Sequence, residues 1–172
     1  MNFKLRFPRG DIGKWSERYE YDDRIPVAIG PTAKTRGYLT KPEFLQMTKW
    51  KTPRTQPRCA DNSAAFVKAA TSTALASRDE RLRIEILTLL GGVQWPTASV
   101  MLHFCAKTPY PILDYRALWS LSCAVAPHDY RFALWEAYCT FTIHLADNAG
   151  VSMRTLDRAL WQYSKENQSA GA

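Results

Sequence analysis

The chain has 172 residues, of which 46% are hydrophobic and 12% aromatic. This composition provides enough apolar material for a core and excludes a chain that is disordered as a whole. The length is typical of one domain, or of one domain with a tail.

Positive charge is concentrated in the N-terminal third of the chain. The 23 basic and 16 acidic residues give a formal net charge of +7. Residues 1–60 hold 13 basic and 6 acidic side chains, whereas residues 61–172 hold 10 of each. We therefore expect a polyanion to bind near the N-terminal third.

Several classes of protein lack support in the sequence. No stretch approaches the roughly 20 consecutive apolar residues of a membrane span, and residues 1–6 have no apolar signal-peptide core, so we expect a cytoplasmic protein with no membrane partner. Cys59, Cys105, Cys123 and Cys139 form no Cys-x-x-Cys pair. We expect reduced thiols, no bound metal and no iron–sulfur cluster.

The first predicted elements, in chain order, are mostly irregular. Residues 1–40 are rich in Gly, Pro and charge, which predicts an irregular basic extension. Residues 41–47 predict a helix with Thr40 as N-cap and Pro42 in its first turn. Residues 50–58 contain two prolines, three cations and a tryptophan, and predict a basic loop.

From residue 61 onward the apolar spacing is helical almost throughout. It predicts helices over residues 64–76, 79–90, 96–106, 115–124, 130–148 and 152–166, the last with Ser152 as N-cap. The predicted fold is all-α, with a helical domain at residues 41–167 and a tail at 168–172. Trp119, Trp135 and Trp161 lie in helical apolar patterns and are expected in the core.

The most informative stretch is residues 90–99, Leu-Gly-Gly-Val-Gln-Trp-Pro-Thr-Ala-Ser. Two helices joined by a tight glycine turn, with Val93 directed inward, predict a helix–hairpin–helix over about residues 79–106. Unpaired N–H groups of such a turn, with the positive end of the second helix dipole, bind a phosphate without reading sequence. We therefore expect double-stranded DNA to contact Gly91, Gly92, Val93, Gln94, Trp95 and Thr97.

This hairpin resembles that of the helix–hairpin–helix DNA glycosylase superfamily, which reads roughly Leu-Pro-Gly-Val-Gly-x-x-Thr-Ala. The chain matches at Leu90, Gly92, Val93, Thr97 and Ala98, and differs at Gly91 and Gln94. The resemblance covers about residues 60–125. It implies an all-α, two-lobed fold and an enzyme that removes bases from DNA.

The resemblance also implies a catalytic residue. The family places an aspartate just beyond the second hairpin helix, and Pro-Ile-Leu-Asp-Tyr-Arg at residues 111–116 falls at that spacing, so the role carries over to Asp114. The lysine nucleophile of bifunctional members corresponds to Pro96, which cannot form a Schiff base, so the resemblance implies a monofunctional enzyme. A second role for Asp114, capping the helix that begins at Tyr115, can coexist with catalysis.

A DNA glycosylase must extrude its target nucleotide and stabilise an oxocarbenium-like sugar. Candidates for the wedge or base pocket are Trp50, Tyr110, Tyr115 and Arg116. Candidates for phosphate contacts are four cations in or next to the predicted basic loop, namely Lys49, Lys51, Arg54 and Arg58. We call residues 49–58 the basic segment.

Several alternatives stay open at this point. The target is either a damaged base, such as an alkylated one, or a modified base of phage DNA, such as glucosylated hydroxymethylcytosine. A function of a different class is a non-catalytic DNA-binding module. We expect a monomer without cofactor, and a monovalent cation at the hairpin is a further option. Residues 1–40 are either an arm over the DNA or a structural brace.

Overall fold

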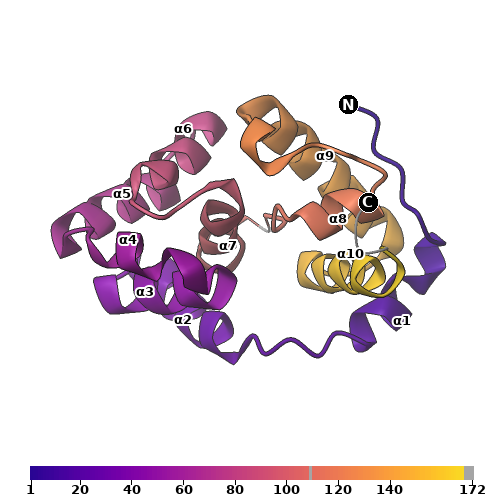
Figure 1. Cartoon of the computed structure of the whole chain (residues 1–172), viewed down its shortest axis with the longest axis horizontal. Helices are drawn as coiled ribbons and strands as arrows, with labels where there is room; N and C mark the ends of the chain where they lie inside the picture. The colour runs from indigo at the N-terminus through magenta and orange to yellow at the C-terminus, as the bar shows by residue number, and fades with distance from the viewer. Residues whose placement is uncertain (109, 169–172) are drawn as a thin grey trace. The chain divides into compact units, whose positions relative to one another are not determined.

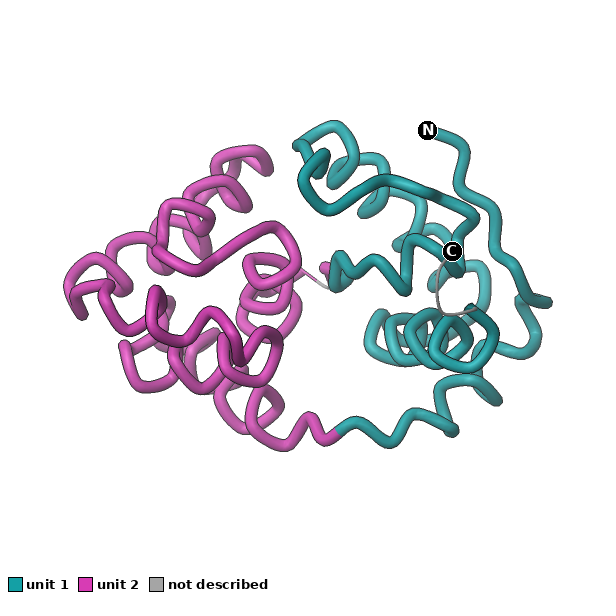
Figure 2. The backbone as a smooth tube through the Cα atoms, in the orientation of Figure 1, with its two compact units in different colours: residues 1–21, 111–172 teal, residues 22–110 magenta. Residues whose placement is uncertain are grey.

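The computed structural model describes residues 1–108 and 110–168, and every regular element in these ranges is a helix (Figure 1). The prediction of an all-α fold is therefore confirmed. The chain divides into two compact units (Figure 2). Unit 1 comprises Met1–Tyr21 and the described residues from Pro111 onward, and unit 2 comprises Asp22–Tyr110. The predicted boundary at residue 40 coincides with neither junction.

Unit 2 is built around the buried helix that follows the glycine turn. Its elements are α2 (Arg24–Arg36), α3 (Lys41–Lys51), η2 (Pro53–Thr55), α4 (Gln56–Ala60), α5 (Ala64–Ala76), α6 (Glu80–Glu85), η3 (Ile86–Leu89) and α7 (Trp95–Cys105). Helix α7 packs against α2, α3 and α6. Seven of its eleven residues are buried, so it supplies much of the core of this unit.

Unit 1 is formed by segments from the N-terminal and C-terminal parts of the chain. Its elements are η1 (Arg9–Asp11), α1 (Ile12–Glu17), α8 (Tyr115–Ser120), η4 (Pro127–Asp129), α9 (Phe132–Ala149) and α10 (Met153–Asn167). Helix α10 packs against α1, α8 and α9. Trp135, Tyr138 and Leu160 are at most 1% exposed and belong to the core of this unit.

Helix starts follow the capping residues of the sequence. Thr40 and Glu43 form a capping box at α3, and the Ser152 side chain accepts the N–H of Thr155 at the start of α10. Both predicted N-caps are confirmed. Such caps satisfy backbone donors that the first turn leaves without a partner, which explains why local sequence locates helix starts well.

The prediction that residues 1–40 are irregular is wrong over two helices, α1 and α2. Pro26 lies in the first turn of α2, where its missing N–H costs nothing. Gly30 is a packing residue, because a Cβ there would lie 2.6 Å from the carbonyl oxygen of Phe104 in α7. Pro26 and Gly30, which favour a turn in the sequence, instead lie within α2. Pro26 is in its first turn, and Gly30 lets α2 approach α7 closely.

The first residues of the chain form a structural brace. The N–H groups of Lys4 and Arg6 donate to the carbonyl oxygens of Leu121 and Ser120, both at 2.9 Å. Phe3 is 9% exposed and packs edge-on against Tyr138. Of the two roles considered for residues 1–40, these contacts support the brace for residues 3–6.

The predicted loop over residues 50–58 is also wrong, because the segment is mostly helical. Helix α3 continues to Lys51, and Pro53 and Pro57 lie in the first turns of η2 and α4. Proline is accepted there because first-turn N–H groups have no intrahelical acceptor. The two prolines start new turns, so the cations between them lie on short helices.

Candidate functional site

The predicted glycine turn is present between η3 and α7 of unit 2. Gly92 has φ +81, and a Cβ at this position would lie 2.6 Å from Sγ of Cys59 and 3.0 Å from the carbonyl oxygen of Thr55. Val93 is 1% exposed, as the inward direction predicted for it requires. The turn thus packs directly on η2 and α4.

Asn62, which the sequence did not single out, also holds the turn. Its Nδ2 donates to the carbonyl oxygens of Cys59 and Gly91 at 2.9 and 3.0 Å, and its Oδ1 accepts the N–H of Gly91 at 2.8 Å. The Gly91 amide is therefore not available to a phosphate, which corrects that part of the prediction. No local motif marks Asn62, since its partner Gly91 lies 29 residues away.

The remaining hairpin amides define a narrower donor set than predicted. The N–H of Val93 donates to Leu90, and that of Thr97 to Gln94. The N–H groups of Gly92, Gln94 and Trp95 form no hydrogen bond with any described residue. These three amides, at the start of the eleven-residue helix α7, are the donors left for an anion.

Thr97 is a packing residue and does not line the surface. It is 3% exposed, and its hydroxyl oxygen lies 3.2 Å from that of Thr52. The predicted DNA contact of Thr97 is thus corrected to a contact that holds α7 against the end of α3.

The basic segment lies beside the hairpin. Arg54 in η2 and Arg58 in α4 are exposed, and these are the short helices on which Gly92 packs. Lys49 is exposed and Lys51 half-buried in the last turn of α3. The fold therefore brings Arg54 and Arg58, predicted as phosphate ligands, to the elements that carry the glycine turn.

Two of the four predicted wedge or pocket residues are packed into unit 2. The indole N–H of Trp50 donates to the carbonyl of Asp22, and its ring lies edge-on to Phe104. Tyr110 is 4% exposed and its hydroxyl lies 2.6 Å from Oε2 of Glu80. Burial, and then the Glu80 carboxylate, raise the pKa of Tyr110. Tyr110 is buried in unit 2, so the pocket role is corrected for Tyr110. Trp50 is half-buried, and its pocket role stays a prediction.

Asp114 lies in unit 1 as the N-cap of α8. Its backbone is extended, with φ −143 and ψ 143, and Oδ1 accepts the N–H of Arg116 at 2.9 Å. The side chain is half-buried. The capping role considered for Asp114 is thus observed, and it fixes the position of the carboxylate.

The segment before Asp114 is anchored by two buried side chains. Oδ1 of Asp157 accepts the N–H of Ile112 at 3.0 Å, and the hydroxyl of Tyr138 donates to the carbonyl of Ile112 at 2.9 Å. Asp157 is 5% exposed and Tyr138 is fully buried. Bonds from α10 and α9 therefore fix the backbone two residues before Asp114.

A third buried side chain, Tyr130, lies within electrostatic reach of Asp114. Tyr130 is 2% exposed, and its hydroxyl has no hydrogen-bond partner among the described residues. Burial raises the pKa of Tyr130 to about 12, and the charge of Asp114 contributes to the shift. The phenol therefore stays protonated to a higher pH than that of an exposed tyrosine.

Tyr115 and Arg116, the other two predicted pocket residues, present a ring and a cation next to Asp114 in the chain. Tyr115 is 50% exposed. The Arg116 guanidinium lies 5.1 Å from the ring centroid of Tyr115 and 5.6 Å from that of Trp161. Trp119 and Trp161 are half-buried, so their expected place in the core is wrong, whereas Trp135 is buried as expected.

The described residues contain no group of three or more His, Cys, Asp or Glu side chains arranged to hold a metal ion. No described helix combines the length and apolarity needed to cross a bilayer. No protein-family model, curated protein or solved structure matches the chain.

Proposed function

We propose that this protein is a monofunctional DNA glycosylase of the helix–hairpin–helix type, with Asp114 as its catalytic carboxylate. The observation that carries the proposal is that two features occur along the sequence at the separation found in that superfamily. One is a hairpin built on a left-handed Gly92 and a buried Val93. The other is an aspartate whose preceding backbone is anchored by Asp157 and Tyr138. An all-α chain with two compact units is consistent with this fold.

Unit 2 is assigned to the DNA backbone. It carries 13 basic and 7 acidic side chains, so most of the net positive charge of the chain belongs to it. The amides of Gly92, Gln94 and Trp95 supply donors to one phosphate, and Arg54 and Arg58 neutralise neighbouring ones. These contacts are independent of sequence, as an enzyme that searches duplex DNA requires.

Asp114 is assigned to the bond-breaking step. Cleavage of the N-glycosidic bond develops positive charge on the sugar, and a carboxylate fixed close to it stabilises that charge and orients the attacking water. The N-cap bond to Arg116 and the anchored Ile112 hold the carboxylate in place before substrate binds. With Pro96 in place of a lysine nucleophile, the product is an abasic site.

Two classes of base fit the proposal, an alkylated or otherwise damaged base and a glucosylated hydroxymethylcytosine of phage DNA. The direct test is base release by the wild-type protein from duplexes carrying alkylated, deaminated, oxidised or glucosylated bases, with abasic sites detected by alkaline cleavage. We expect the protein to release one of these two classes of base. We also propose that it acts as a monomer in the cytoplasm. Failure on every duplex, with DNA binding intact, would instead favour a non-catalytic DNA-binding module.

The assignment of the basic segment predicts a salt effect. The double variant Arg54→Ala/Arg58→Ala should bind duplex DNA roughly tenfold more weakly at moderate salt, because two phosphate contacts are lost. The slope of log affinity against log salt should become shallower by about 2, from roughly 0.9 per phosphate contact. Fluorescence anisotropy across a salt titration measures both quantities.

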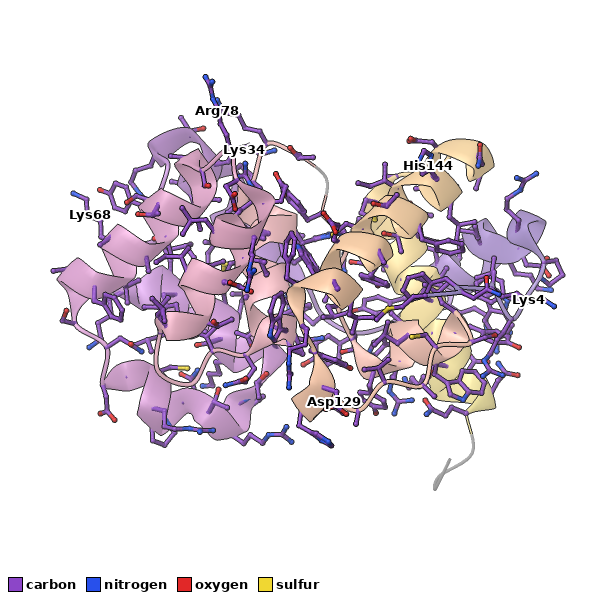
Figure 3. All side chains as sticks on the ribbon, turned by 90° about the horizontal axis from the view of Figure 1, so that it is seen from above. Lys4, Lys34, Lys68, Arg78, Asp129 and His144 are labelled. Carbon is purple, nitrogen blue, oxygen red and sulfur yellow. The ribbon has the colours of Figure 1, made fainter. Side chains whose placement is uncertain are left out.

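The matched control is Lys34→Ala/Arg78→Ala, which removes two exposed cations of the same unit (Figure 3). The control has the same net charge as the test variant. An equal change of slope in both would mean that overall charge, and not a site beside the hairpin, determines DNA affinity.

A further inference from the structure

A cluster of aromatic side chains lies on one face of α10 in unit 1. The ring of Trp161 meets that of Tyr19 edge-on, with centroids 5.3 Å apart, and that of Tyr21 at 6.1 Å with an interplanar angle of 43°. Tyr19 and Tyr21 follow α1, which packs along α10. Segments from the two ends of the chain thus form one aromatic group.

Cations surround these rings. The Arg116 guanidinium and the Lys165 ammonium lie 5.6 and 5.4 Å from the Trp161 centroid, and the Arg158 guanidinium lies 5.6 Å from that of Tyr19. Positions 158, 161 and 165 recur at helical spacing and share one face of α10. We call Tyr19, Tyr21, Trp161, Arg116, Arg158 and Lys165 the α10 aromatic surface.

This surface is separate from the core of unit 1. Tyr21 is 48% exposed and Lys165 is exposed, and the other four members are half-buried, whereas the core residue Trp135 is 1% exposed. Tyr115, beside Arg116, adds a further exposed ring. Since apolar area left in water contributes nothing to folding, the exposed parts of these rings offer binding area to a ligand.

The cationic character of the surface is local. Unit 1 as a whole holds 10 basic and 9 acidic side chains, so its charge nearly balances. Of the two acids on α10, Asp157 is buried against the N–H of Ile112, and Glu166 pairs with Arg18 and also interacts with the charge of Lys165. The exposed Glu20 lies between Tyr19 and Tyr21, so three cations face two acids at this surface. The cations beside the rings therefore favour an anionic ligand with flat groups.

We propose that the α10 aromatic surface binds unpaired nucleotides of a nucleic acid strand. Bases stack on Tyr21 and Trp161, and Arg116, Arg158 and Lys165 bind the phosphates between them. Stacking rings interleaved with cations are the combination that single strands require, because their bases expose π-faces that a duplex conceals. An acidic peptide would use the cations but has no need of the rings.

The binding needs no bond cleavage, so it extends the proposed function without depending on Asp114 chemistry. The test is fluorescence anisotropy with a labelled oligothymidylate, which contains no damaged base, and with a duplex of equal length. We expect Trp161→Ala and Lys165→Ala to weaken oligothymidylate binding, the former on the order of tenfold. Duplex binding, assigned to unit 2, should change little.

The controls separate this surface from general effects. Phe66→Ala removes an exposed ring of unit 2, and Lys4→Ala removes an exposed cation of unit 1 (Figure 3). Both should bind oligothymidylate as the wild type does. Trp161→Phe, which keeps a stacking ring, should retain most of the affinity, and thermal melting verifies that each variant is folded.

The proposal is overturned if folded Trp161→Ala binds oligothymidylate as tightly as the wild type, or if the controls lose as much affinity. It is also overturned if polyglutamate competes as well as unlabelled oligothymidylate, since that result indicates an acidic protein partner. If the protein releases bases but does not bind oligothymidylate, the proposed role of the α10 aromatic surface is wrong and the proposed glycosylase activity is not. If the protein binds oligothymidylate but releases no base, the proposed glycosylase activity is wrong and the proposed role of the α10 aromatic surface is not.

Discussion

Replacement of Asp114 by Asn should lower base release by on the order of a thousandfold, the scale expected when a charge that stabilises the transition state is removed. Asn lacks the negative charge that opposes the developing positive charge on the sugar. It nevertheless keeps an oxygen able to accept the Arg116 N–H, so the cap of α8 should persist. The change therefore separates the chemical role of Asp114 from its structural role.

The measurement is single-turnover base release, with thermal unfolding of the same variants as the folding check. Asp114→Asn should unfold close to the wild-type temperature. Asp114→Ala, which also removes the cap, should lose about 1 kcal/mol of stability. If Asp114→Asn releases bases as fast as the wild type, Asp114 is a helix cap and not the catalyst.

The parts of the site that were predicted from the sequence are those determined by neighbouring residues. The glycine turn, the buried Val93 and the helix starts at Thr40 and Ser152 each depend on chemistry within a few positions. The family spacing added Asp114 as a candidate. Such local patterns favour particular backbone conformations whatever their distant contacts, so a single sequence is enough to locate them.

The features that the sequence did not predict depend on contacts between distant residues. Asn62 reaches Gly91 across 29 positions, and Asp157 reaches Ile112 across 45. The sequence predicts a core position for Trp161 because helical periodicity identifies an apolar face but not the element that packs on it. In the structure, its ring lies beside Tyr19 and Tyr21 from the other end of the chain. Only the packing of α1 on α10 brings them together.

Gly92→Ala should be the most destabilising single change at the hairpin, with a loss of roughly 3 kcal/mol in the free energy of unfolding. Part of the loss comes from placing a Cβ on a residue with φ +81. The rest comes from the steric conflict of that Cβ, 2.6 Å from Sγ of the fully buried Cys59 and 3.0 Å from the Thr55 carbonyl. Urea denaturation monitored by circular dichroism measures the loss.

Gly37→Ala in the same unit is the matched control, because Gly37 has φ +83 but no described atom beyond its chain neighbours and its own helix backbone lies within 4 Å of the position that a Cβ would occupy. It should lose only the backbone contribution, about 1 kcal/mol. The difference between the two variants then measures how tightly the turn is packed on α4. Equal losses would show that Cys59 yields without cost, and the hairpin would then be too loosely supported to present the Gly92, Gln94 and Trp95 amides in a fixed geometry. A large difference would mean that the same packing that stabilises unit 2 also orients its anion-binding donors.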